Sequence, residues 1–186
     1  MRPDDAVRVP IVSADCNGVT GRDEKVDSWR IELVPITHPD AARLVEEVQL
    51  EYVERYGSRD ETPIQPAYFE PPAGSFFVGY LDGVPVATGA WRRRTDVLAL
   101  GSSASAEIKR MYVAAAGRRR GLARAMLAHL EATAAASGAE VMILETGAAQ
   151  PEALELYASA GYQPIPGFGF YKDSPLNRCM ARLISG

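Results

Sequence analysis

The chain has 186 residues, of which 47% are hydrophobic and 24% charged, the length and balance of one globular domain with a hydrophobic core. Its formal net charge of −4 disfavours a nucleic-acid-binding protein that works through an overall positive field. Cys16 and Cys179 lie far apart and belong to no zinc-ligand spacing, so we expect no metal site.

The amino-terminal segment, residues 1–28, has little periodicity and many small polar and charged residues, the composition of a flexible extension. It lacks the apolar core of a signal peptide, and no apolar run in the chain approaches the roughly 18 residues of a membrane span. We therefore expect a cytoplasmic protein with reduced thiols. From Trp29 apolar and polar residues alternate, which predicts a half-buried strand and the start of the folded domain, residues 29–186.

A first helix is predicted after this strand. Pro39 and Asp40 precede apolar residues spaced three and four apart, and the pattern stops at Gly57, so the helix should end near Tyr56. Residues 58–74 contain four prolines and several acids, which predicts a loop with at most one short helix.

Two antiparallel strands follow. Asp82-Gly83 separates the apolar runs 75–81 and 85–93, and this dipeptide between apolar runs is a strong hairpin signal. Residues 94–105 are predicted to form a turn region, and a fourth strand is expected from Glu107 to Val113.

The rest of the chain alternates between helical and strand patterns. A helix from about Arg120 to Ser137 would place Leu122, Met126 and Leu130 on one stripe. The remaining predicted elements are a strand at 141–146, a helix from Pro151 to Gly161, and strands at 162–165 and 177–184. This order predicts an α/β domain with a mixed central sheet.

The turn before the second long helix has the features of a phosphate-binding site. Gly117 and Gly121 bracket three arginines, glycine lets backbone approach a ligand closely, and a helix start offers unpaired N–H groups and partial positive charge. The chain contains neither G-x-x-x-x-G-K-[ST] nor a G-x-G-x-x-G after a strand, which disfavours ATP-type P-loops and classical dinucleotide folds.

The sequence Arg118-Arg119-Arg120-Gly121-Leu122-Ala123 resembles the [Gln/Arg]-x-x-Gly-x-[Gly/Ala] signature of the GCN5-related N-acetyltransferases, the GNAT family. The predicted strand 107–113, the strand end 144–147 and the segment 150–162 resemble the same family in its chain order. The resemblance extends roughly from Trp29 to the carboxyl terminus. It implies a mostly antiparallel mixed sheet flanked by helices, with strands four and five splayed apart, and acetyl-CoA as co-substrate.

The resemblance also implies how acetyl-CoA would be bound. The turn and helix start would hold the pyrophosphate, backbone groups of strand four would contact the thioester and pantetheine arm, and Gln150 stands where many relatives carry a pantetheine-binding asparagine. The implied cofactor-binding residues are Met111, Tyr112, Val113, Arg118, Arg119, Arg120, Gly121, Leu122, Ala123, Arg124 and Gln150.

Two residues are candidates for acid–base catalysis. Alkyl amines titrate near pH 10, roughly three units above neutrality, so an acceptor amine needs a base. Glu107 resembles the strand-four carboxylate that many GNAT enzymes use, and shares a period-two face with Lys109, Met111 and Val113. The alternative is that Glu107 pairs with Lys109 or Arg110 on a solvated edge.

Tyr157 stands at the position of the tyrosine that the family uses as general acid toward the thiolate. A phenol near pKa 10 that protonates a thiolate near 8.5 does so at a cost of about 2 kcal/mol, so the site must adjust one of the two pKa values. The alternative is a core tyrosine on a buried stripe.

The acceptor site is expected between the 58–74 loop and the Gly-rich aromatic loop that contains Phe168, Phe170 and Tyr171. Acidic loop residues such as Asp60 would attract a cationic amine. The cluster Arg92-Arg93-Arg94 is predicted to be a solvated turn, and neither His38 nor His129 is assigned to catalysis.

The leading functional hypothesis is an acetyl-CoA-dependent N-acetyltransferase that acts directly on a small-molecule amine, without an acyl-enzyme. The alternatives are a non-catalytic acyl-CoA sensor with a GNAT-like fold and, less favoured, a nucleic-acid-binding domain. We expect no nucleic-acid or membrane partner; a homodimer is left open.

Overall fold

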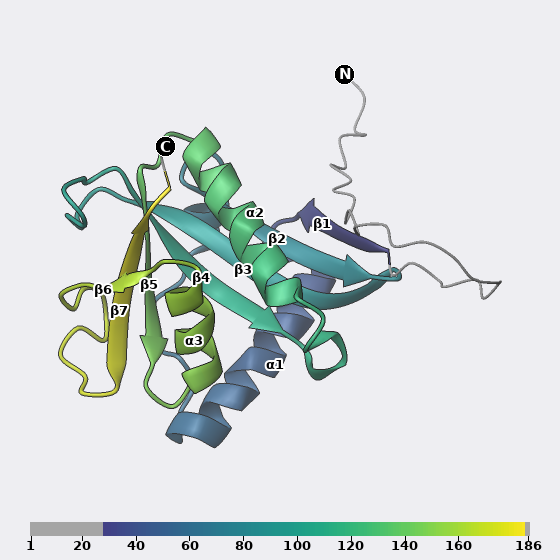
Figure 1. Ribbon diagram of the computed structural model, residues 1–186. Helices are drawn as coiled ribbons and strands as arrows, with labels where there is room; N and C mark the ends of the chain where they lie inside the picture. Colours follow the sequence, from purple (N-terminus) through teal and green to yellow (C-terminus); the bar gives the residue numbers. More distant parts are fainter. Residues whose placement is uncertain (1–27, 185–186) are drawn as a thin grey trace, which may run out of the picture.

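The structure is a computed structural model, and it describes residues 28–184 (Figure 1). The predicted amino-terminal extension lies outside the described residues except for Ser28. No helix within residues 28–184 is both long and apolar enough to cross a membrane.

A central sheet of seven strands organises the domain, in the order β1-β2-β3-β4-β5-β7-β6. All neighbouring strands are antiparallel except β4 and β5. The strands are β1 Trp29–Leu33, β2 Gly74–Leu81, β3 Val84–Arg94, β4 Ser105–Val113, β5 Val141–Gly147, β6 Gln163–Pro164 and β7 Asn177–Leu183. The helices are α1 Pro39–Tyr56, α2 Leu122–Ala136 and α3 Pro151–Ser159, with short 3₁₀ turns η1 Pro66–Phe69 and η2 Ala115–Gly117.

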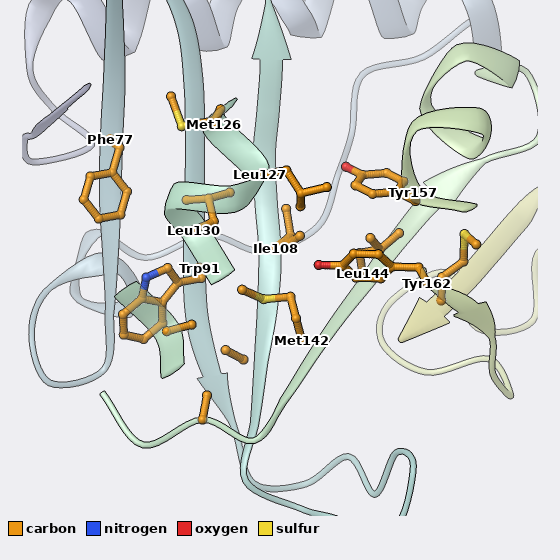
Figure 2. Close-up of a cluster of buried hydrophobic side chains, with 14 of the residues drawn as sticks. Phe77, Trp91, Ile108, Met126, Leu127, Leu130, Met142, Leu144, Tyr157 and Tyr162 are labelled. Atoms are coloured by element: carbon orange, nitrogen blue, oxygen red, sulfur yellow. The ribbon is translucent and has the colours of Figure 1, made fainter. Parts of the chain in front are cut away.

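Helices cover both faces of the sheet. On one face the α2 residues Met126, Leu127 and Leu130, together with Tyr157 of α3, pack on strand residues that include Trp91 and Ile108 (Figure 2). On the other face α1 contributes Ala41 and Leu44 to a cluster with Phe76, Val78 and Ala90. The predicted mixed α/β architecture is confirmed.

Local signals predicted several boundaries well. The Asp82-Gly83 turn joins β2 to β3 with both residues at positive φ, 51° and 82°, as a two-residue hairpin requires. Helix α1 ends at Gly57, whose left-handed φ of 79° lets its N–H donate to the Val53 carbonyl. His38, left without a role by the sequence, caps the start of α1, since its Nδ1 accepts from the Asp40 N–H at 3.2 Å.

Other boundaries were wrong by a few residues. Strand β4 begins at Ser105, two residues before the predicted start, and α3 ends at Ser159 instead of Gly161. The predicted strand 162–165 is reduced to the two residues of β6.

A bulge in β4 changes which residues share a face. The β3–β4 register shifts between Thr88 and Ala90, and Arg110 adopts a left-handed φ of 52° opposite the shift. The extra residue moves Met111 and Val113 onto the α2 side, where they pack with the cluster that contains Ile108. The predicted common face of Glu107, Lys109, Met111 and Val113 is therefore wrong beyond Lys109.

Strands β4 and β5 separate beyond the middle of the sheet. Their parallel ladder pairs only residues 105–108 with residues 141–144, whereas β4 continues to Val113 and β5 to Gly147 (Figure 1). The predicted splay is confirmed. It leaves the β5-facing backbone groups of residues 109–113 without a strand partner.

Candidate active site

A cavity of about 310 Å³ lies at the splayed end of β4 and β5. Residues from α1, the 58–62 loop, both strands, α3, the loop before β7 and the start of β7 line it. The lining residues include Tyr52, Asp60, Thr62, Lys109, Arg110, Met111, Glu145, Gly147, Gln150, Tyr157, Tyr171 and Asn177. Segments far apart in the sequence thus converge where the sheet opens.

Tyr157 reaches this cavity from α3. Its side chain is buried, and its hydroxyl donates to the Met111 sulfur of β4 at 3.6 Å. Figure 2 shows the Tyr157 ring within the buried cluster. Burial, and to a smaller degree nearby Tyr52, raises the pKa of Tyr157 well above the usual phenol range. Tyr157 is thus both a core residue and a protonated phenol at the cavity.

Glu107 lies outside the cavity lining. Its side chain is 0% exposed and pairs with Arg92 Nε at 2.8 Å, with Lys109 Nζ at 2.7 Å, and with Arg94. Burial raises the pKa of Glu107, but the charges of Lys109 and Arg92 outweigh burial and hold it below its usual value. The contacts match the ion-pair alternative, in a buried rather than a solvated setting, and they disfavour proton exchange with an acceptor.

The arginine cluster was predicted incorrectly as a solvated turn. Arg92 and Arg94 are in β3, their side chains are only 15% and 14% exposed, and both contact Glu107. Arg93 points to the other side and donates to the carbonyls of Pro72 and Ser137. The antiparallel register, which sets Arg92 opposite Glu107, accounts for the difference.

Glu145 lies near the end of β5, and the sequence patterns predict no role for it. It lines the cavity; its Oε2 lies 3.3 Å from Lys109 Nζ, and its Oε1 accepts from the Asn177 amide at 3.1 Å. No local pattern distinguishes this acid from other strand-end acids. Its position at the cavity depends on where β5 leaves β4.

The sequence suggests Arg110 as a possible partner for Glu107. It pairs instead with Asp60, whose carboxylate also accepts from the Thr62 N–H at 2.8 Å. Burial raises the pKa of Asp60, but the charge of Arg110 and these hydrogen bonds bring it below its usual value. The left-handed backbone at the bulge aims Arg110 toward the 58–62 loop.

The turn before α2 keeps the features predicted for it. Arg119 and Gly121 have left-handed φ values of 60° and 76°, and a Cβ on Gly121 would meet no atom within 4 Å. The helix's first hydrogen bond runs from the Ala125 N–H to the Gly121 carbonyl, so the preceding N–H groups lack partners within the helix. An exposed, open turn that leads into a helix start fits a pyrophosphate.

Two arginines of this region connect it to other elements. Arg118 donates to the Val113 carbonyl at 3.0 Å and to both oxygens of Glu51 in α1 at 2.9 Å. Arg124 donates to the Ser159 hydroxyl of α3 at 2.7 Å. The turn therefore lies alongside the helix that carries Tyr157.

Gln150 precedes α3 and lines the cavity. Its side-chain carbonyl accepts weakly, at 3.4 Å, from the Thr146 hydroxyl and from the Gly147 N–H. The amide is thus held at the end of β5, where the strands are apart.

The three aromatic residues predicted for the acceptor site do not form one platform. Phe168 is 8% exposed and packs in a core cluster with Ile143 and Cys179. Phe170 is 54% exposed and lies in a separate groove beside the Arg92–Arg94 cluster. Only Tyr171 lines the cavity, where its hydroxyl accepts from the Glu61 N–H at 2.8 Å.

Residues 41–162 match the family described as the acetyltransferase (GNAT) family. The chain belongs to the GNAT family. A relative named IAA acetyltransferase, from Azospirillum brasilense, is 34% identical over 76 residues, which cover 41% of this chain and 50% of that protein. The chain thus matches about half the length of this curated relative.

Solved GNAT-like structures share the fold. A Klebsiella pneumoniae protein described as a candidate acyl-CoA N-acyltransferase is 25% identical, with a TM-score of 0.66 over 84% of this chain and 97% of that chain. The Salmonella typhimurium protein yncA, solved with its cofactor acetyl-CoA, is 18% identical, with a TM-score of 0.60 over 84% of this chain and 94% of its own. The Escherichia coli ribosomal-protein-S18-alanine N-acetyltransferase is 19% identical, with a TM-score of 0.57 over 85% of this chain and 95% of that chain.

Proposed function

We propose that this GNAT protein transfers an acetyl group from acetyl-CoA directly to the amine of a small molecule. The observation that carries the proposal is the buried Tyr157 hydroxyl, which reaches the cavity between the splayed strands beside the open turn of α2. We place the reaction in a domain that begins at Trp29, and in the cytoplasm, as the sequence predicts.

Bound acetyl-CoA would supply an acetyl thioester, and the residues of this chain would bind and orient it. We propose that backbone N–H groups of the turn, with its arginines, hold the pyrophosphate. The unpaired edge of β4 at Met111, Tyr112 and Val113, and the amide of Gln150, would contact the arm that leads to the thioester. A backbone N–H on that edge would also stabilise negative charge on the thioester oxygen.

Tyr157 is the proposed general acid. Its raised pKa keeps the phenol protonated at neutral pH, so a proton is available for the departing sulfur. The same burial that raises the pKa of Tyr157 would raise that of a thiol at the cavity, because desolvation disfavours both anions. The pKa gap between phenol and thiol therefore need not widen.

Direct transfer is supported by the chemistry of the lining. Among the described residues, those that line the cavity include neither cysteine nor histidine. Cys179 packs in the core, and burial raises the pKa of its thiol, which keeps it in the poorly nucleophilic protonated form.

Glu107 is not retained as the base. Its contact with three cations, and its position outside the cavity lining, support a structural role.

A thiol-release assay with acetyl-CoA tests the proposal against a panel of amino acids, polyamines, aminoglycosides and peptides. We expect acetyl-CoA-dependent thiol release with at least one amine, and a large loss in Tyr157→Phe. Tight CoA binding without turnover on any amine would instead support the non-catalytic sensor.

A further inference from the structure

Two ionisable side chains enter the cavity from opposite faces of the sheet. Along β5, Leu144 packs in the cluster beneath α2 and α3, whereas Ile143 packs in the cluster on the other side. Because side chains alternate along a strand, Glu145 lies on the Ile143 side. Tyr157 comes from α3, on the Leu144 side, and both residues line the same cavity.

Glu145 has fewer charged partners than Glu107. The Nζ of Lys109 lies 2.7 Å from Glu107 and 3.3 Å from Glu145, so it contacts Glu107 more closely. Two cations of β3, Arg92 and Arg94, also bind Glu107. Glu145 contacts Lys109 and the Asn177 amide, which hold the carboxylate in position and leave it the capacity to accept further hydrogen bonds.

The cavity offers one other acid among its described lining residues. Asp60 pairs with Arg110 and accepts from the Thr62 N–H, and these partners stabilise its charged form. A proton acceptor must reach the acceptor amine and keep a lone pair for it. Glu145 meets both requirements better than Asp60, and Glu107 does not reach the cavity lining.

We propose that Glu145 is the general base of this site, and that Lys109 and Asn177 are its positioning residues. This inference rests on the proposed acetyl transfer, and it specifies the face of the sheet from which the acceptor amine approaches. The acceptor is a primary ammonium that approaches from the Glu145 face, while the cofactor's sulfur lies on the Tyr157 face. The base and the acid therefore lie on opposite faces of the sheet, at the gap between β4 and β5.

The proton balance follows from this arrangement. A nitrogen–hydrogen bond of the ammonium breaks, and Glu145 takes the proton and later releases it to solvent. The nitrogen lone pair forms the new bond to the acetyl carbon, and the carbon–sulfur bond breaks with its electron pair on sulfur. Tyr157 gives its proton to sulfur and is reprotonated by the second proton that the nitrogen loses. Overall, one proton is released for each amide formed.

The need for such a base sets the size of the expected effect. At pH 7 about one in a thousand molecules of an alkyl amine is neutral. A positioned base typically contributes roughly 10²- to 10⁴-fold to the rate. Loss of the carboxylate should therefore matter most near neutrality and less as the pH approaches the pKa of the amine.

Glu145→Gln is the decisive variant, because it removes the charge and keeps the shape. With one accepted amine, we expect kcat/KM to fall by about 10²-fold at pH 7 and the deficit to shrink by pH 9.5. Glu155→Gln, the same change on the exposed side of α3, is the matched control and should keep the parent profile. A Glu145→Gln profile that superimposes on the parent would overturn the assignment.

A binding measurement without acetyl-CoA separates this inference from the proposed function. By calorimetry at pH 7, Glu145→Gln should weaken binding of the amine about tenfold, because the ammonium loses its counter-ion, and unchanged affinity would count against the assignment. Glu145→Asp, which keeps the charge, should retain most of the affinity and covers the case in which the Gln variant fails to fold. Wild-type protein that binds the amine but releases no thiol would overturn the proposed function itself, and the base with it.

Discussion

Arg92 and Glu107 face each other directly across the β3–β4 ladder, with Arg92 Nε 2.8 Å from the Glu107 carboxylate. Arg94, two residues further along β3, lies on the same side of the sheet and contacts the same carboxylate. Lys109, two residues after Glu107 in β4, contacts it as well. The carboxylate is fully buried and cannot be hydrated, so these cations compensate its negative charge. The ion pairs connect the sheet interior to the cavity through Lys109, which also contacts Glu145.

Glu107→Gln should be strongly destabilising. It leaves Arg92, Arg94 and Lys109 in a buried site without the negative charge that compensates them, and breaking a buried pair typically costs about 3–5 kcal/mol. Urea titration followed by circular dichroism measures the change. Glu155→Gln, on the protein surface, should stay within about 0.5 kcal/mol of wild type. A cost below 1 kcal/mol for Glu107→Gln would show that the cluster contributes little.

Stability should fall in acid partly through Glu107 and Asp60. Both carboxyls have pKa values below their usual range in the folded protein. Each therefore stabilises the fold above its unfolded-state pKa, about 4, and this contribution is lost as the pH falls through the lower folded-state pKa. The free energy of unfolding should decline from about pH 5 downward, and less steeply in a folded Asp60→Asn variant. Parallel curves for wild type and variant would contradict a lowered pKa at Asp60.

Tyr157→Phe should separate chemistry from packing. Within the described residues, the hydroxyl donates to the Met111 sulfur, which is a weak acceptor, so loss of this bond should change the stability by less than about 1 kcal/mol. Turnover should fall by roughly 10²-fold while CoA affinity stays within a factor of about three. Single-turnover kinetics ensure that chemistry is the step observed. Wild-type single-turnover rates would leave Tyr157 as a core residue alone.

Gly121→Val should weaken CoA binding at least tenfold. A Cβ there would meet no atom within 4 Å, so the cause would be the left-handed φ of 76°, which a β-branched residue adopts only at a cost of about 1–3 kcal/mol. The turn would change conformation, and its N–H groups would no longer converge on the pyrophosphate.

Gly83→Val is the matched control for this test. Gly83 has a similar φ of 82° with open space around it, but it lies in the β2–β3 hairpin. It should lose comparable stability and keep CoA affinity in calorimetric titration. Equal CoA affinity in Gly121→Val and Gly83→Val would show that the turn at Gly121 is not part of the cofactor site.

Features of the fold that depend on neighbouring residues could be predicted from the sequence. The Asp82-Gly83 hairpin, the end of α1 at Gly57 and the turn at Gly121 each require a left-handed backbone, and the residue types that tolerate it are visible in the chain. The buried stripe of α2 follows from its helical spacing. The motif around Gly121 then indicated the GNAT family, and with it the splay of β4 and β5.

Only the tertiary structure decided which charges meet. Arg92 and Glu107 are 15 residues apart and Lys109 and Glu145 are 36 apart, so their contacts depend on strand register and order. The bulge at Arg110 moves Met111 and Val113 to the opposite face of the sheet, because one extra residue shifts the two-residue alternation of side chains. No residue type within 107–113 predicts this bulge. The sequence around Phe168 is compatible both with a side chain that covers a substrate and with one that packs in the core. Its loop folds back beside β7 and places it among Ile143 and Cys179, and a contact of that kind is set by packing across the sheet and by no local pattern.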